Sequence, residues 1–164
     1  WVHARTVEDV AVAIEEMVTQ SSGPYFATLW AMVLAAREAA CQRLTGDSAR
    51  RAVVAAGERL IATRPTNDHQ RQAVAWVVGA VDAAESGDLV EDALAGARAG
   101  DHAYRESSRR MGEAAAAVLP EEGSILTHCW GDLYLTSTVA AAQRAGKRWR
   151  FSVRRRGRIC RVLG

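Results

Sequence analysis

The sequence is poor in cysteine, and none of its cysteines is placed to hold a metal or a disulfide framework. Its three cysteines, Cys41, Cys129 and Cys160, are odd in number and far apart. No Cys-x-x-Cys or Cys/His pair has the spacing of a zinc site. We therefore expect neither a disulfide scaffold nor a bound metal, and the reducing cytoplasm is the compartment that fits three unpaired thiols best.

Long apolar runs and nucleotide-binding loops are also missing. No apolar stretch reaches 18 residues and no signal peptide precedes the first expected helix, so the sequence predicts neither export nor a membrane span. It contains neither G-x-G-x-x-G nor G-x-x-x-x-G-K-[ST]. A dinucleotide fingerprint and a Walker loop are therefore excluded, and we expect no cofactor.

Carboxylates are absent from the C-terminal end of the chain. Residues 133–164 carry nine Lys or Arg and no Asp or Glu, whereas residues 1–132 carry all 19 carboxylates against 12 cations. The net charge of +2 hides this asymmetry. A strongly basic end favours an anionic partner, either phosphate groups or nucleic acid.

The chain has room for one ordinary domain, or for a small domain and part of another, and it favours helices at first. Hydrophobic residues make up 49% of its 164 residues, and alanine, the best helix former, dominates them. Thr6 has the features of an N-cap, with Asp9 in the capping-box position. Apolar periodicity predicts helices over about 7–20, 25–44, 49–62 (capped by Asp47 or Ser48), 68–85 (capped by Asn67 or Asp68) and 88–119, the last divided or kinked near Gly100.

A β-α-β pattern follows these helices. Short apolar runs predict strands over 124–126 and 149–153, and the segment between them, 132–145, has helical periodicity. The fold class is therefore α+β tending to α/β. We expect a helical domain over residues 1–120 and the start of an α/β domain over 121–164.

Reactive side chains come directly after the first predicted strand. Thr127, His128 and Cys129 lie where that strand ends and the next helix begins, which is the carboxyl edge where α/β folds bind ligands. A helix N-terminus favours the thiolate, so Cys129 is a candidate nucleophile or general base. The alternative is that Cys129 is a small buried hydrophobe. His128 is too near in sequence to pair with it, because neighbours on a strand point to opposite faces.

Two further segments suit an anion. Arg64 stands with Pro65 and Thr66 in an extended turn before a helix N-terminus, which favours phosphate binding; the alternative is a turn with a solvated arginine. The basic segment 150–161 could form a phosphate cradle around its Arg-Gly-Arg158 turn, or a nucleic-acid patch, since aromatic residues interleave with its arginines. A third alternative is a charged, disordered end.

Two motifs in this order resemble a known superfamily. Ile125-Leu-Thr-His-Cys129, with Thr63-Arg-Pro-Thr66 upstream, is similar to methylthioribose-1-phosphate isomerase, ribose-1,5-bisphosphate isomerase and the regulatory subunits of translation initiation factor 2B. The resemblance covers about residues 45–150 and includes Arg109-Arg-Met-Gly112 and the Ala-Gly-Lys147 turn. It implies an N-terminal helical domain followed by a Rossmann-like domain, with dimers forming through the latter.

The resemblance also implies a chemistry. Cys129 would act with a later aspartate to convert an aldose phosphate into a ketose phosphate, and Arg64 would hold the phosphate of the sugar. We assign the remaining substrate-binding positions to Pro65, Thr66, Thr127, His128, Arg154 and Arg158. A phosphorylated sugar and a homo-oligomer or larger complex are the expected partners.

The sequence departs from the isomerase pattern in three places, which keeps other functions open. Trp130-Gly-Asp-Leu133 replaces a small-residue loop, no Arg-Gly-Ala loop is evident near the start, and residues 152–158 keep only the basic and glycine character of their counterpart. We expect the acidic partner in a part of the α/β domain beyond Gly164. The alternatives are a non-catalytic regulatory subunit of the same superfamily, and an unrelated helical domain with a nucleic-acid-binding tail.

Overall fold

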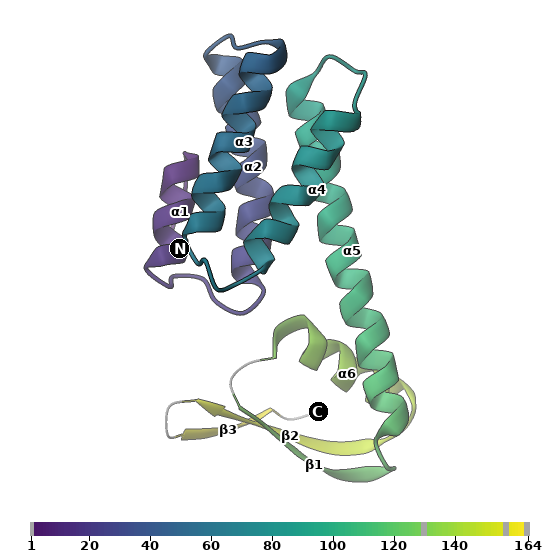
Figure 1. Ribbon diagram of the computed structural model, residues 1–164. Helices are drawn as coiled ribbons and strands as arrows, with labels where there is room; N and C mark the ends of the chain where they lie inside the picture. The colour runs from purple at the N-terminus through teal and green to yellow at the C-terminus, as the bar shows by residue number, and fades with distance from the viewer. Residues whose placement is uncertain (1, 129–130, 156–157, 163–164) are drawn as a thin grey trace. The chain divides into compact units, whose positions relative to one another are not determined.

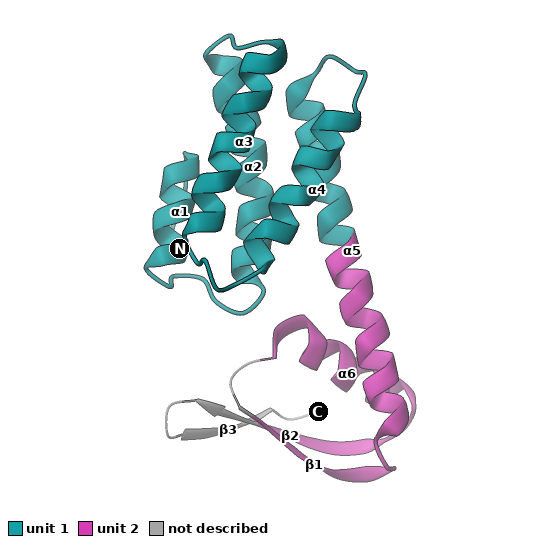
Figure 2. Cartoon of the chain, viewed as in Figure 1, with its two compact units in different colours: residues 1–102 teal, residues 103–164 magenta. Residues whose placement is uncertain are grey.

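The computed structural model of the protein describes the backbone of residues 2–128, 131–155 and 158–162, and the side chains of residues 2–127 and 131–152. The chain forms two compact units, residues 1–102 and 103–164, which divide inside the long helix α5 (Figure 2). No helix in the described ranges has both the length and the apolarity that crossing a bilayer requires.

The first unit is entirely helical (Figure 1). It consists of α1 (Val7–Glu15), α2 (Gly23–Cys41), α3 (Gly46–Ala62), α4 (His69–Ala83) and the first part of α5 (Leu89–Val118). Helix α2 packs against α1, α3 and α4, so it is the central helix, as its near-continuous apolarity predicts. The largest fully buried apolar side chains are Ile14, Tyr25, Leu29, Met32, Val53, Leu60 and Val77.

Local capping chemistry sets where these helices begin. The predicted capping box of α1 is confirmed: the Asp9 N–H donates to Thr6 Oγ1 at 3.1 Å, and the Thr6 N–H donates to Asp9 Oδ2 at 3.0 Å. Helix α3 begins at Gly46, so its predicted cap at Asp47 or Ser48 is wrong; the N-cap is Thr45. At α4 the N-cap residue is Asp68, and Asn67 Oδ1 accepts the His69 N–H at 3.0 Å.

Polar contacts hold the short helix α1 against its neighbours. The Arg59 guanidinium on α3 bonds Glu8 at 2.6 Å and Glu15 at 2.7 Å, one carboxylate near each end of α1. Glu38 on α2 accepts the Val7 N–H at 3.1 Å. These hydrogen bonds from Arg59 hold the pKa of both glutamates below the ordinary value of 4.5.

This arrangement predicts an acid-sensitive docking of α1. Because both folded-state pKa values are lowered, the stabilisation is complete above the unfolded value of 4.5 and is lost as the pH falls through the folded values. We expect the thermal midpoint of the wild type to drop more steeply between about pH 5 and about pH 3 than that of Arg59→Gln. Arg51→Gln, which alters an exposed arginine on the same helix, should keep the wild-type slope. Parallel slopes for all three proteins would contradict the prediction.

Helix α5 is one continuous helix of 30 residues, so of the two predicted alternatives the division into two helices near Gly100 is wrong and a single long helix is present. The glycines there serve close packing. A Cβ atom at Gly100 would lie 2.8 Å from Leu29 Cδ2, and one at Gly96 would lie 2.8 Å from the Trp76 carbonyl oxygen. The Tyr25 hydroxyl donates to the Gly100 carbonyl at 3.0 Å. The first part of α5 therefore lies too close to α2 and α4 for a side chain at these positions.

The second unit contains the predicted β-α-β pattern, with one strand more than predicted. It comprises the end of α5, β1 (Glu122–His128), α6 (Asp132–Arg144), β2 (Arg148–Arg155) and β3 (Arg158–Val162). The sheet order is β1-β2-β3, in which β1 and β2 are parallel and β2 and β3 antiparallel. The fold class is α+β. The basic segment, for which no strand was predicted beyond residue 153, supplies β3.

One face of this sheet packs against α6. Phe151 on β2 is buried with Leu135 of α6, and Ile125, Val139 and Trp149 pack around this pair. Gly123 lies opposite Trp149 in the β1–β2 register, and its missing side chain leaves room for the indole ring, whose nearest atom would be 2.6 Å from a Cβ there. The Trp149 indole N–H donates to the Pro120 carbonyl at 2.9 Å.

Lys147 closes the C-terminal end of α5. Its Nζ donates to the Ala116 carbonyl at 2.9 Å, which also accepts the Leu119 N–H at 3.3 Å, and to the Leu119 carbonyl just beyond the last helical residue. We expect Lys147→Met to lower the free energy of unfolding by about 1–2 kcal/mol, measured by urea denaturation. Arg144→Met is the control, because Arg144 is exposed and its ion pair with Glu113 is 3.7 Å long. Equal stability of the two variants would show that the Lys147 bonds contribute nothing.

Candidate functional site

The predicted catalytic segment lies at the carboxyl edge of the parallel strands. β1 ends at His128 and α6 begins at Asp132, so the chain passes through Cys129 between a strand end and a helix start. Residues 129–130 themselves lie outside the described residues. The expected strand and helix are both present in that order (Figure 1).

Strand register brings four predicted binding positions to this same edge. Thr127 pairs with Val153 and His128 with Arg154 across the parallel β1–β2 ladder. Arg155 pairs with Arg158 where β2 passes into β3. The backbone positions of Thr127, His128, Arg154 and Arg158 are therefore neighbours, although they come from three strands. The Thr127 side chain is half-buried.

The backbone at the start of α6 is unusual. Asp132 has a φ of 53°, in the left-handed region that few residues other than glycine adopt, and aspartate is among the exceptions. The N-cap is Gly131, which has no side chain to bond the first-turn N–H groups. Backbone outliers of this kind concentrate at functional sites, and helix starts attract anions. The sequence held no signal for this conformation.

Arg64 is not the solvated arginine of the alternative interpretation. Its side chain is half-buried, and Nη2 donates to the Ile14 carbonyl at 3.1 Å and to the Thr19 carbonyl at 3.5 Å. Arg64 thus ties the end of α1 to the following loop. Nε and Nη1 make no hydrogen bond to another described residue, so N–H groups on these two nitrogens remain for a ligand. Pro65 and Thr66 are exposed.

The predicted site residues come from both units. Arg64, Pro65 and Thr66 belong to residues 1–102, and the carboxyl-edge positions belong to residues 103–164. Within the second unit the structure brings Thr127, His128, Arg154 and Arg158 to one edge of the sheet. That Arg64 faces the same substrate as Cys129 stays a prediction.

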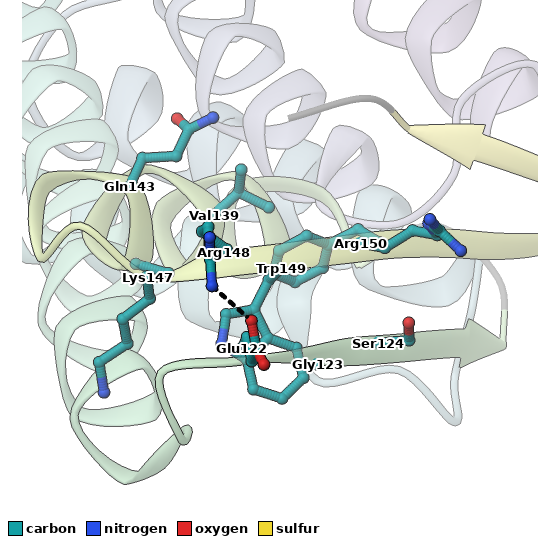
Figure 3. A pocket seen from close by; sticks show the side chains of 11 residues that line it. Glu122, Gly123, Ser124, Val139, Gln143, Lys147, Arg148, Trp149 and Arg150 are labelled. Carbon is teal, nitrogen blue, oxygen red and sulfur yellow. Dashed lines mark hydrogen bonds and ion pairs between the residues drawn. The ribbon is translucent and has the colours of Figure 1, made fainter.

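A pocket of about 780 Å³ lies at the opposite, amino edge of the sheet (Figure 3). Its polar lining looks suited to an anion, yet two of its cations have partners within the protein. Arg148 pairs with Glu122 at 2.7 Å, as the dashed line in Figure 3 shows, and Lys147 bonds the carbonyls at the end of α5. Because ligands of parallel sheets bind at the carboxyl edge, this pocket is not the candidate site.

The described side chains offer no obvious metal site. No group of three or more His, Cys, Asp or Glu side chains within these ranges is placed to hold a metal ion. The chemistry that the described residues can supply is anion binding, by Arg64 in one unit and by the start of α6 in the other.

Comparison with known proteins places this architecture in a family, although no family model matches the chain. Methylthioribose-1-phosphate isomerase from Xylella fastidiosa (strain 9a5c) is 32% identical to it over 134 residues, which are 79% of this chain and 36% of the isomerase. The crystal structure of translation initiation factor eIF-2B, subunit delta, from A. fulgidus superposes with a TM-score of 0.73 at 26% identity. That match covers 93% of this chain and 47% of the subunit.

The chain thus spans about a third of the length of the isomerase and about half of the initiation factor subunit. Both relatives belong to the superfamily that the motifs around Arg64 and Cys129 resemble. The chain belongs to the superfamily of methylthioribose-1-phosphate isomerase and the subunits of translation initiation factor 2B.

Proposed function

We propose that this chain is part of a cytoplasmic sugar-phosphate isomerase that converts an aldose phosphate into a ketose phosphate, with methylthioribose 1-phosphate or ribose 1,5-bisphosphate as substrate. The observation that supports the proposal is the parallel β1-α6-β2 unit, in which β1 ends at His128 and α6 begins at Asp132, in a chain 32% identical to such an isomerase. In this proposal residues 121–164 are the start of a Rossmann-like domain.

The proposed chemistry needs a base and an acid on either side of the first two sugar carbons. In both substrates C1 is bonded to the phosphate ester oxygen and to the ring oxygen O4. The C1–O4 bond therefore breaks, the hydrogen on C2 passes to C1, and the O2 hydroxyl proton passes to O4, so that C2 becomes the carbonyl without net change in atoms. Cys129 at the start of α6 is one of the two groups, because a helix N-terminus stabilises a thiolate. The second would be a carboxylate outside residues 1–164.

The phosphate would be held by positive charge and free N–H groups. Nε and Nη1 of Arg64 can each donate to one phosphate oxygen, while Nη2 stays bonded to the Ile14 and Thr19 carbonyls. Thr127, His128, Arg154 and Arg158 stand at the edge where the second unit would receive the sugar. Fixing the phosphate holds C1 and C2 beside the reacting groups.

Isomerisation and thermal-shift assays with both sugar phosphates test this function. In the whole isomerase of which this chain is proposed to be part, we expect turnover that Cys129→Ser abolishes and that Cys41→Ser, at an exposed cysteine of the first unit, leaves unchanged. Stabilisation by the sugars without turnover would exclude catalysis by this chain and support the second candidate below. Neither stabilisation nor turnover would overturn the proposal.

The second candidate is a non-catalytic binding or regulatory subunit. It is favoured by the superposition on an initiation factor 2B delta subunit over 93% of the chain. A bulky Trp130 directly after Cys129 would also be tolerated where no substrate must react. In the third alternative, nucleic-acid binding through the basic segment 150–161, affinity would fall steeply with salt.

A further inference from the structure

Two arginines, one on α3 and one in the turn after it, meet the last turn of α1. Arg59 bonds Glu15, the last residue of α1, through Nη1 at 2.7 Å and Nη2 at 3.2 Å. Arg64 Nη2 donates to the carbonyl of the preceding residue, Ile14, at 3.1 Å. All four residues belong to the first unit. One helix turn therefore binds both a structural arginine and the arginine to which the phosphate has been assigned.

The orientation of the Arg64 guanidinium depends on α1 and on the loop that follows it. The backbone of Arg64 is held in its own turn, where its carbonyl accepts the Asn67 N–H at 3.0 Å. The guanidinium lies at the end of a stem with several rotatable bonds, and its hydrogen bonds to described residues go to the carbonyls of Ile14 and Thr19. The position of these two carbonyls therefore determines where the remaining N–H groups of Arg64 point.

Helix α1 needs contacts with other helices to keep its position. It has nine residues, and an isolated helix of that length is marginal in water. The loop after it is strained, because Met17 and Ser21 have φ values of 59° and 56°, in a region that is unfavourable for residues other than glycine. Arg59 stabilises both ends of α1, since it bonds Glu8 and Glu15 with two hydrogen bonds to each carboxylate. Such a network is stronger than a single exposed ion pair.

We propose that Glu15 and Arg59 are positioning residues for Arg64. Their ion pair fixes the last turn of α1, and the Ile14 carbonyl in that turn holds the guanidinium in the orientation in which Nε and Nη1 meet an anion. This inference rests on the part of the proposed function that assigns the phosphate of the sugar to Arg64. A guanidinium that is already held loses less entropy when the ligand binds. The affinity for the phosphate therefore depends on the fraction of molecules in which this turn is in place.

The variants Glu15→Ala and Glu8→Ala separate positioning from stability. Each removes two hydrogen bonds to the same arginine, so both should lower the thermal midpoint. Only Glu15 is adjacent to Ile14, whereas Glu8 lies near the other end of α1. We therefore expect the dissociation constant of the sugar phosphate to rise about threefold to tenfold in Glu15→Ala and to stay within about twofold of the wild type in Glu8→Ala.

Isothermal titration calorimetry with ribose 1,5-bisphosphate and with methylthioribose 1-phosphate, on the whole protein that contains this chain, provides the measurement. Arg64→Gln is the reference variant, and its dissociation constant should rise about tenfold or more. In the Arg64→Gln background Glu15→Ala should change the dissociation constant no further, because its effect passes through Arg64.

The outcomes distinguish this inference from the proposed function. If the wild type binds neither sugar, or if Arg64→Gln binds as the wild type does, Arg64 does not hold the phosphate, and both the assignment and the inference are wrong. If Arg64→Gln weakens binding but Glu15→Ala does so no more than Glu8→Ala, the assignment stands and the inference alone is wrong. An equal further loss from Glu15→Ala in the Arg64→Gln background would also overturn the inference.

Discussion

Replacing Gly112 by valine is expected to lower the free energy of unfolding by about 3 kcal/mol or more, at the upper end of what overpacking costs. A Cβ atom at Gly112 would lie 2.5 Å from both the carbonyl carbon and the Cβ of Ser137, and 2.7 Å from the Thr138 nitrogen. Two of these three atoms are backbone atoms of α6, so no rotamer change relieves the clash. The end of α5 and α6 must move apart.

Separation of these helices would also uncover the small apolar cluster between them, in which Ala116 of α5 is buried with Ala141 and Ala142 of α6. Urea denaturation followed by circular dichroism measures the effect. The matched control is Met111→Val, which places the same β-branched residue one position earlier, where the side chain is 48% exposed. Its expected effect is within about 0.5 kcal/mol, apart from the small loss of helix propensity. Equal stability of the two variants would mean that α5 and α6 do not pack as closely as the structure shows.

Gly112 and Gly100 show why only some helix ends could be predicted from the sequence. Both interrupt a helical pattern, and a glycine in such a pattern predicts either an end or a kink. Whether the helix ends, bends or continues at such a glycine depends on residues distant in sequence. Leu29 and Trp76 pack against Gly100, and Ser137 packs against Gly112. The helix ends that depend on residues a few positions apart, such as the Thr6 and Asp9 capping box, were predictable for the same reason.

The β-α-β unit was predictable because its signals are also local. Short apolar runs and one helical period placed β1, α6 and β2, although each strand extends beyond its predicted bounds. The sequence analysis did not predict β3, because polar and apolar residues do not alternate in this arginine-rich segment. Its strand conformation depends on pairing with β2. Strand pairing is a tertiary property that composition alone does not encode.

In the candidate site, too, the features set by local sequence were predictable and those set by tertiary contacts were not. The carboxyl-edge position of the Thr127–Cys129 segment follows from the order of strand and helix, and the register supports it by placing His128 beside Arg154. The sequence also singled out Arg64, but not the two carbonyl oxygens that fix it, because Ile14 and Thr19 are more than 40 residues away in the chain. The residue type predicts that the Arg64 guanidinium binds anions. The fold determines which of its N–H groups remain for a ligand, because Nη2 is bonded to two carbonyls.

Gln70 provides a prediction of opposite sign to that for Gly112. Its side chain is fully buried at the start of α4, and neither Nε2 nor Oε1 has a hydrogen-bond partner among the described residues. A buried polar group without a partner costs about 1–3 kcal/mol. Methionine is similar in length and flexibility and has no strong polar group, so Gln70→Met should raise the free energy of unfolding by about that amount. Gln42→Met, at an exposed position, is the control and should gain nothing.

The sign of this change tells how the core of the helical unit is built. Thr28 Oγ1 on α2 is also buried and has no hydrogen-bond partner in the part of the chain that the structure describes, and α2 is a helix against which α4 packs. If both groups are simply unsatisfied, Gln70→Met and Thr28→Val stabilise independently and the double variant shows the sum. A loss of stability in Gln70→Met would contradict the prediction. If, in addition, the double variant lost less than the two single variants together, the two groups would share a bound water.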